Sequence, residues 1–167
     1  AQLAALHAAS WAVAYRGVFS DHFLDHGVGA DRAEVWRQRF ASDEPRRIVL
    51  VLDQAGALDG FVCAYADHDE EHGSLIDNLH VRPELKRGGH GRRLLRALAD
   101  ALDARASHPA VHLWCYQRNS IGRAFYDRIG GRVVETVEND VTIGDLPATS
   151  LRYRWDTIDA LRRSCTP

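Results

Sequence analysis

The stretch Arg82-Pro83-Glu84-Leu85-Lys86-Arg87-Gly88-Gly89-His90-Gly91-Arg92-Arg93-Leu94-Leu95 separates an apolar run from an amphipathic one. Three glycines in four residues let the backbone turn tightly and approach a ligand, and the start of a helix presents unpaired amides and a positive dipole end. Four basic side chains add positive charge: Lys86, Arg87, Arg92 and Arg93. The stretch therefore predicts a phosphate site, although a plain glycine turn would have the same composition.

Two common phosphate-binding patterns do not fit this loop. The sequence has no GxxxxGK[ST] for a nucleoside triphosphate, and GHGRRL lacks the third glycine of the dinucleotide fingerprint. A nucleotide-binding module is therefore a weak alternative.

The residues on either side of the loop predict a strand-helix-strand unit. SLIDNLHV (74–81) is typical of a strand ended by Pro83, and RRLLRALADALDARA (92–106) carries a leucine stripe typical of a helix packed on a sheet. VHLWCY (111–116) is the next apolar, β-branched run. We expect a right-handed crossover that joins two parallel strands.

Hydrophobic periodicity predicts the remaining elements. Helices are expected at 2–15, from about 31 to 40 and at 120–129; strands at 47–53, 58–66, 132–138 and 149–155; and irregular loops at 18–30 and 67–73. The order predicts a mixed-sheet α/β or α+β fold in a single domain, 1–167.

The composition narrows the classes of function. A net charge of -2 argues against a nucleic-acid binder, and no apolar run approaches the length of a membrane span. Three scattered cysteines form no CxxC pair, so neither a disulfide framework nor a zinc site is predicted, and a cytoplasmic location is expected. The histidines of His68-Asp-Glu-Glu-His72 do not form HExxH, which leaves a solvated loop as the interpretation there.

Two spaced motifs resemble the GNAT N-acetyltransferase superfamily. The segment from Lys86 to Gly91 resembles its pyrophosphate loop, Q/R-x-x-G-x-G/A, with lysine at the first position, and the preceding IDNLHVRPE is similar to its central strand. Asn119-Ser-Ile-Gly-Arg-Ala-Phe-Tyr126 is similar to a second family element. The resemblance implies a mostly antiparallel twisted sheet with a central β-α-β crossover and flanking helices, and a further strand before Ala1.

The resemblance also implies a reaction, the transfer of an acetyl group from acetyl-CoA to a primary amine without a metal. The pantetheine arm would follow the backbone of Leu79, His80 and Val81, with main-chain contacts at the first and last of these. The pyrophosphate would meet the loop from Lys86 to Arg92, at the amides of Arg87, Gly88, Gly89, Gly91 and Arg92, with His90 between them. The Asn119 side chain would contact the cofactor further along.

Acyl transfer to an amine needs a neutral amine and a proton for the departing thiolate. By resemblance Tyr126 is the candidate general acid; a core tyrosine with a bonded hydroxyl is the alternative. In a regularly alternating strand Asp77 shares a face with Leu79 and Val81, which makes it a candidate base or an anchor for a cationic substrate. His80, on the opposite face, is expected to pack.

The acceptor is predicted only as a small-molecule amine or a peptide. Trp11, Tyr15 and Trp114, along with Trp36, are candidates to line its pocket, although core packing is the usual role of such residues. Acidic residues such as Asp69–Glu71 hint at a cationic acceptor, but solvated loops are commonly acidic too. A catalytically silent acyl-CoA-binding module remains the alternative function, and an exposed late strand is compatible with a homodimer.

Overall fold

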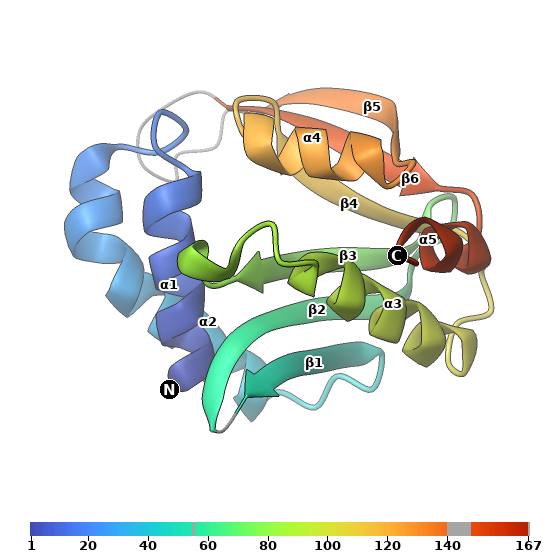
Figure 1. The fold of residues 1–167 in the computed structure, drawn as a ribbon, viewed down its shortest axis with the longest axis horizontal. Coiled ribbons are helices and arrows are strands. Elements are labelled where there is room, and N and C mark those ends of the chain that lie inside the picture. The colour runs from blue at the N-terminus through green and yellow to red at the C-terminus, as the bar shows by residue number, and fades with distance from the viewer. Residues whose placement is uncertain (55, 140–147, 167) are drawn as a thin grey trace.

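A six-stranded sheet organises the part of the chain that the computed structural model describes, residues 1–54, 56–139 and 148–166 (Figure 1). The strands are β1 (Arg47–Gln54), β2 (Ala57–Asp69), β3 (Gly73–Val81), β4 (Val111–Tyr116), β5 (Arg132–Asn139) and β6 (Ala148–Trp155), in the spatial order β1-β2-β3-β4-β6-β5. Neighbours are antiparallel except β3 and β4, which are parallel. The predicted mixed, mostly antiparallel sheet is confirmed.

The described helices lie on both faces of this sheet. They are α1 (Gln2–Ala14), α2 (Val28–Ala41), α3 (His90–Asp103), α4 (Ser120–Arg128) and α5 (Ile158–Ser164), with a π-helical segment at Phe23–Gly27 and a 3-10 turn at Pro83–Leu85. None of these helices has the length and apolar character needed to cross a membrane. Helix α3 forms the crossover between β3 and β4, as predicted.

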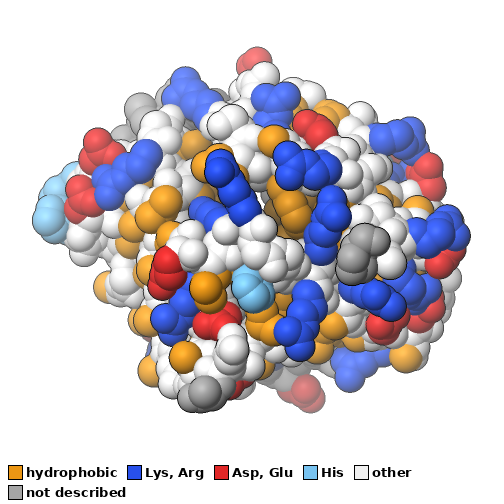
Figure 2. Space-filling view, in the orientation of Figure 1, with side chains coloured by type: hydrophobic (Ala, Val, Ile, Leu, Met, Phe, Trp, Pro, Cys, Tyr) orange, Lys and Arg blue, Asp and Glu red, His pale blue; other side chains and the backbone are white. Residues whose placement is uncertain are grey.

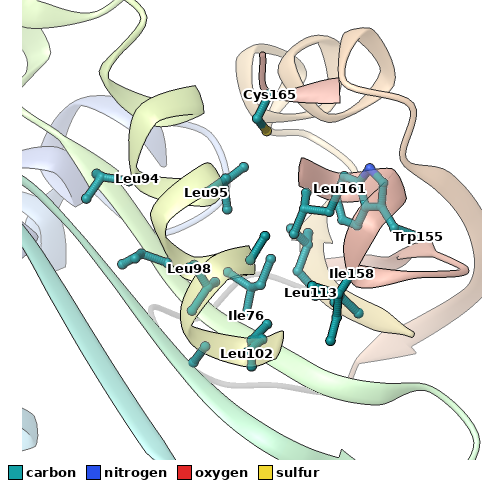
Figure 3. Packing of buried hydrophobic residues seen from close by; sticks show 14 of the residues in the cluster. Ile76, Leu94, Leu95, Leu98, Leu102, Leu113, Trp155, Ile158, Leu161 and Cys165 are labelled. Carbon is teal, nitrogen blue, oxygen red and sulfur yellow. The ribbon is translucent and has the colours of Figure 1, made fainter. Parts of the chain in front are cut away.

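The main core lies between α3 and the sheet. Leu95, Leu98 and Leu102 of α3 are fully buried and point toward Ile76 and Leu113 of the two parallel strands (Figure 3). Trp155, Ile158, Leu161 and Cys165 close the same cluster beside α5. The leucine stripe thus fixes α3, and with it the glycine loop, against the strands that flank the site.

A second, more polar core lies under α1 and α2. His7 accepts a hydrogen bond at Nδ1 from the Trp36 indole (3.0 Å), and His80 Nδ1 is 2.9 Å from the Ser10 hydroxyl. Burial, helped by the charges of nearby basic groups, lowers the pKa of His80 to about 3, so its ring is neutral. His80 therefore packs on the α1 face, as its strand position predicts.

The structure differs from the sequence predictions in three details. The segment 18–30 is helical over most of its length, because Leu24 and Val28 bury their side chains beside Trp11 and the helix start is fixed by ion pairs from Arg16. Helix α5 was not predicted, although Thr157 caps it by accepting a hydrogen bond from the Ala160 amide (3.0 Å). Strand β2 also runs on to Asp69, into the expected loop.

Candidate functional site

The two parallel strands pair briefly and then separate. Ser74 pairs with Val111, Leu75 with His112 and Ile76 with Leu113, and no further pairing joins the described parts of β3 and β4. The strands diverge toward α1 (Figure 1), and a cavity of about 230 Å³ lies where they part. Its described lining is Trp11, Tyr15, Arg32, Arg39, Ile76, Asp77, Asn78, Leu79, His80, Leu113, Trp114, Tyr116, Tyr126 and Ser150.

The glycine loop turns sharply into α3. Gly89, the N-cap residue of α3, has φ +80°, in the left-handed region that glycine adopts without steric cost. A Cβ on Gly91 would lie 3.2 Å from Cζ of Phe125, so this glycine permits close packing of the α3 start against α4. Backbone conformation at Gly89 and close packing at Gly91 therefore favour glycine at both positions where the sequence resembles the family motif.

The same turn leaves several amides directed away from the protein's own acceptors. In the described part of the chain, no hydrogen bond from the amides of Arg87, Gly89, His90, Gly91 or Arg92 is recorded. The Gly88 amide differs from its expected role, since it donates to the Leu85 carbonyl at 3.3 Å. Lys and Arg side chains border an apolar patch between this loop and α4 (Figure 2). The arrangement suits an anionic ligand.

Tyr126 of α4 reaches the cavity from the main-core side. Its ring lies 5.4 Å from Phe125 and 5.5 Å from Tyr153, and burial raises its pKa well above the usual value of 10. The phenol therefore keeps its proton at neutral pH. A half-buried, protonated hydroxyl that lines a cavity can donate to a developing anion.

Asp77 lies where β3 is irregular. The register shifts because Cys63 pairs with Asn78 and Ala64 with Ile76, which leaves Asp77 in a bulge. Its carboxylate forms an ion pair with Arg39 of α2 at 2.6 Å.

The bulge corrects the prediction made from regular alternation. Leu79 and Val81 pack against the α3 core, whereas Asp77 faces α2, so the three do not share a face. The Asp77 carboxylate still borders the cavity.

The predicted aromatic residues divide between cavity and core. Trp11, Tyr15 and Trp114 line the cavity, but Trp36 does not and packs beside Phe61 instead. Trp114 is also covered by the Arg152 guanidinium, 4.5 Å from its ring.

Two arginines of the cavity were not predicted. Arg32 and Arg39 are seven residues apart on α2, a spacing that puts both on one helix face. This spacing is the only sign of the pair in the sequence. Tyr116 was missed as well.

The acidic loop does not belong to this cavity. Asp69 accepts hydrogen bonds from the amides of Glu71 and His72 and pairs with Arg152 at 3.2 Å, beside a separate pocket. The acidic residues of this loop therefore do not indicate a cationic acceptor in the cavity. Among the described residues no cluster of histidine, cysteine or acidic side chains could hold a metal ion.

Cys115 of β4 has no sign of activation. It is 4% exposed, and burial raises the pKa of its thiol to about 12. It is a buried strand cysteine, and a thiolate at this position is not available for nucleophilic attack.

Asn119 has a structural role that was not predicted. Its side-chain oxygen accepts a hydrogen bond from the Gly122 amide (2.9 Å) and so caps α4, the helix that carries Tyr126. The amide nitrogen of the same side chain is the group left for the expected cofactor contact.

Replacement of Asn119 can separate these two roles. We expect Asn119→Ala to destabilise the protein by about 1 kcal/mol through loss of the cap. Asn119→Ser keeps a capping oxygen but removes the side-chain N–H, so it should retain stability while weakening acetyl-CoA binding severalfold. Urea unfolding and calorimetry measure the two effects. Unchanged binding in both variants would leave Asn119 with the capping role alone.

The fold and the comparisons with known proteins define an acetyltransferase, the class that the resemblance of the two motifs implied. A family model described as the acetyltransferase (GNAT) family matches residues 9–131, and the chain therefore belongs to this family. A Mycobacterium tuberculosis protein named "Probable N-acetyltransferase" is 28% identical over 133 residues, covering 76% of this chain and 71% of that protein.

Solved structures share the fold. The PaiA N-acetyltransferase of Thermoplasma acidophilum, determined in complex with coenzyme A, has a TM-score of 0.65 at 18% identity and covers 92% of this chain and 91% of its own. An acetyltransferase from Thermus thermophilus has a TM-score of 0.61 at 21% identity, with coverages of 91% and 89%.

Proposed function

We propose that the protein transfers the acetyl group of acetyl-CoA to a primary amine by direct attack within a ternary complex. One observation carries the proposal: the parallel strands separate over a cavity that Tyr126 and Asp77 both border. The glycine loop lies at the start of the same crossover, between β3 and α3, and has amides free for an anion. The cofactor's pyrophosphate would bind at this loop, and its pantetheine arm would enter between β3 and β4.

The backbone of β3 suits the proposed pantetheine contact. The segment from Asn78 to Val81 pairs with β2 on one side, but no described residue of β4 pairs with it on the other. Leu79 and Val81 therefore present their backbone edge toward the gap, with His80 between them. An amide-rich arm would continue the hydrogen-bond ladder of the sheet here.

In the proposed reaction the amine nitrogen attacks the thioester carbonyl carbon, and the carbon–sulfur bond breaks as the amide bond forms. The thiolate takes a proton from the protonated Tyr126 phenol. The attacking nitrogen releases its proton to water, and the Tyr126 phenolate takes a proton back from water, so the phenol is restored for the next turnover. Cys115 takes no part because its thiol stays protonated, so no acetyl-cysteine intermediate is proposed.

Mass spectrometry of products tests this function. The protein would be incubated with acetyl-CoA and a pool of amines, amino acids and peptides, and acetyl-CoA binding would be measured by calorimetry. An acetylated product confirms an enzyme. Tight binding with no turnover of any amine favours the alternative, a silent acyl-CoA-binding module, and absence of binding overturns the proposal.

For Asp77 we propose the role of anchoring the acceptor's amino group. The ion pair with Arg39 holds the carboxylate in a fixed position at the cavity wall. We expect Asp77→Asn to raise the acceptor KM about tenfold and to change kcat less, because one charge-assisted contact is lost.

A matched variant controls for the charge change. Asp100→Asn removes an aspartate that pairs with Arg162 on the exposed side of α3 and should leave both constants unchanged. A fall in kcat at constant KM in Asp77→Asn, lessened at higher pH, would instead identify Asp77 as the base.

A further inference from the structure

Arg32 is a buried cation in the wall of the cavity. Its side chain is 10% exposed, and its guanidinium lies over the Trp11 ring, 4.1 Å from the centroid. Residue 32 lies in α2, where Val28 and Trp36, one turn to each side, are buried. The arginine therefore has little freedom to swing out into water.

The known partner of Arg32 leaves part of the guanidinium unused. Nε donates to Asp31 Oδ2 at 2.7 Å, and Nη2 donates to the same oxygen. No hydrogen bond from Nη1 is recorded within the described residues, and Asp31 itself does not line the cavity. One N–H edge of the arginine is thus available to a ligand.

The rest of the cavity does not neutralise this charge. Asp77 is the one acidic side chain in its described lining, and it is already paired with Arg39. Arg32 also acts electrostatically on Tyr15, Tyr116 and His80, which line the cavity around it. Its positive charge therefore raises the electrostatic potential in the part of the cavity where an acceptor would lie.

Arg32, Asp77 and the Tyr15 phenol line the same cavity, and the two charges act on the phenol in opposite directions. Burial raises the pKa of Tyr15, while Arg32 acts to lower it and Asp77 acts to raise it. Tyr15 therefore lies within electrostatic reach of both a free cation edge and a carboxylate. An acceptor that carries an amino group and an acidic group could satisfy both at once.

We propose that the acceptor is an amine that also carries a carboxylate, as in a free amino acid, and that Arg32 binds this carboxylate while the amino group lies toward Asp77. This inference rests on the proposed function and narrows its substrate class. Arginine suits the role because its planar N–H groups match the two oxygens of a carboxylate. The aromatic wall of Trp11, Tyr15 and Trp114 would contact the side chain of the acceptor.

Paired acceptors test the inference. Alanine, glutamate, phenylalanine and tryptophan would each be compared with the corresponding amino-acid amide, which keeps the amine but lacks the α-carboxylate. We expect at least one amino acid to exceed its amide in kcat/KM by about 10- to 100-fold, the effect of one hydrogen-bonded charge. Equal or better turnover of every amide would overturn the inference while leaving the acetyltransferase function intact.

Substitution assigns the preference to Arg32. We expect Arg32→Gln to lower kcat/KM for the preferred amino acid to near that of its amide and to leave the acetyl-CoA Kd unchanged, which also shows that the variant is folded. Arg37→Gln is the control, because Arg37 is 67% exposed on the same helix and pairs only with Glu34 among described acidic groups. An unchanged amino-acid preference in Arg32→Gln contradicts the proposal.

A binding experiment separates this inference from the proposed function. Calorimetry on the CoA-loaded protein would compare each N-acetyl amino acid with its amide, and this needs no turnover. Carboxylate-dependent binding that Arg32→Gln abolishes supports the Arg32 site even if no acetylation is detected. Binding that is independent of the carboxylate, or absent for all eight ligands of this panel, overturns it.

Discussion

Tyr126→Phe is expected to lower kcat by about 100-fold or more while leaving the acetyl-CoA Kd unchanged. General acid catalysis by a positioned side chain is worth about that factor, and phenylalanine keeps the ring contacts with Phe125 and Tyr153. Stopped-flow or steady-state kinetics and calorimetry measure the two quantities. A variant with full kcat would exclude the phenol from proton transfer and leave Tyr126 as a packing residue.

The control for this variant is a neighbouring buried tyrosine. The Tyr153 hydroxyl donates to Asp127 at 2.9 Å, and Tyr153 does not line the cavity. Tyr153→Phe should therefore lower stability by about 1 kcal/mol, as loss of one hydrogen bond does, with kcat unchanged. Equal losses of kcat in both variants would indicate a general packing effect.

The pH profile gives an independent check on Tyr126. Burial raises its pKa well above the usual 10, so the phenol keeps its proton to higher pH than a free tyrosine. A reaction that needs this proton loses it only as the pH rises through the raised pKa. We therefore expect no fall in wild-type kcat between pH 7 and about 9.5, the lower side of an ordinary tyrosine titration.

Gly89→Asp is expected to weaken acetyl-CoA binding by about 100-fold or more. Gly89 has φ +80°, which aspartate tolerates better than most residues, and no atom lies within 4 Å of a Cβ built there. The new carboxylate would face the proposed pyrophosphate site, and placing like charges together costs several kcal/mol. Calorimetric titration with acetyl-CoA measures the change.

The chain contains a closely matched control for this variant. Gly56, in the turn after β1, has φ +82° and is equally open, so Gly56→Asp imposes the same backbone strain far from the loop. Both variants should lose similar stability, and only Gly89→Asp should lose acetyl-CoA. If Gly89→Asp bound acetyl-CoA normally, the pyrophosphate would not bind at this turn.

Local patterns accounted for most of the sheet and for the crossover. The leucine stripe of α3 and the apolar runs of β3 and β4 carry their own periodicity, so each element could be recognised without knowing its neighbours. The start of α2 was missed because its stability comes from burial of Leu24 and Val28 against α1, which no local pattern records. Helix α5 was missed because it is short, at Ile158–Ser164.

Some candidate site residues could be recognised from local sequence, whereas the position of others depended on tertiary packing. Trp11, Tyr15, Trp114 and Tyr126 were all chosen from the sequence and all line the cavity. Asp77 also lines the cavity, but from the opposite face of β3 to the one that strict alternation predicts. The bulge opposite Cys63 and Ala64 turns its carboxylate toward α2. A bulge arises from the pairing of two strands, so the sequence pattern of either strand alone does not predict it.

The sequence by itself was enough to predict the glycine turn, the helix that follows it and the choice of Tyr126 in α4 as a candidate site residue. Each of these depends on a local property: backbone freedom, amphipathic period or motif spacing. Only the tertiary structure decided the charge of the cavity between β3 and β4. It brought Arg32 and Arg39 of α2 to the gap between β3 and β4 and kept acidic Asp69 beside Arg152. The physical reason is that a cavity's charge depends on residues brought together by long-range packing, so net charge and loop composition could not predict it.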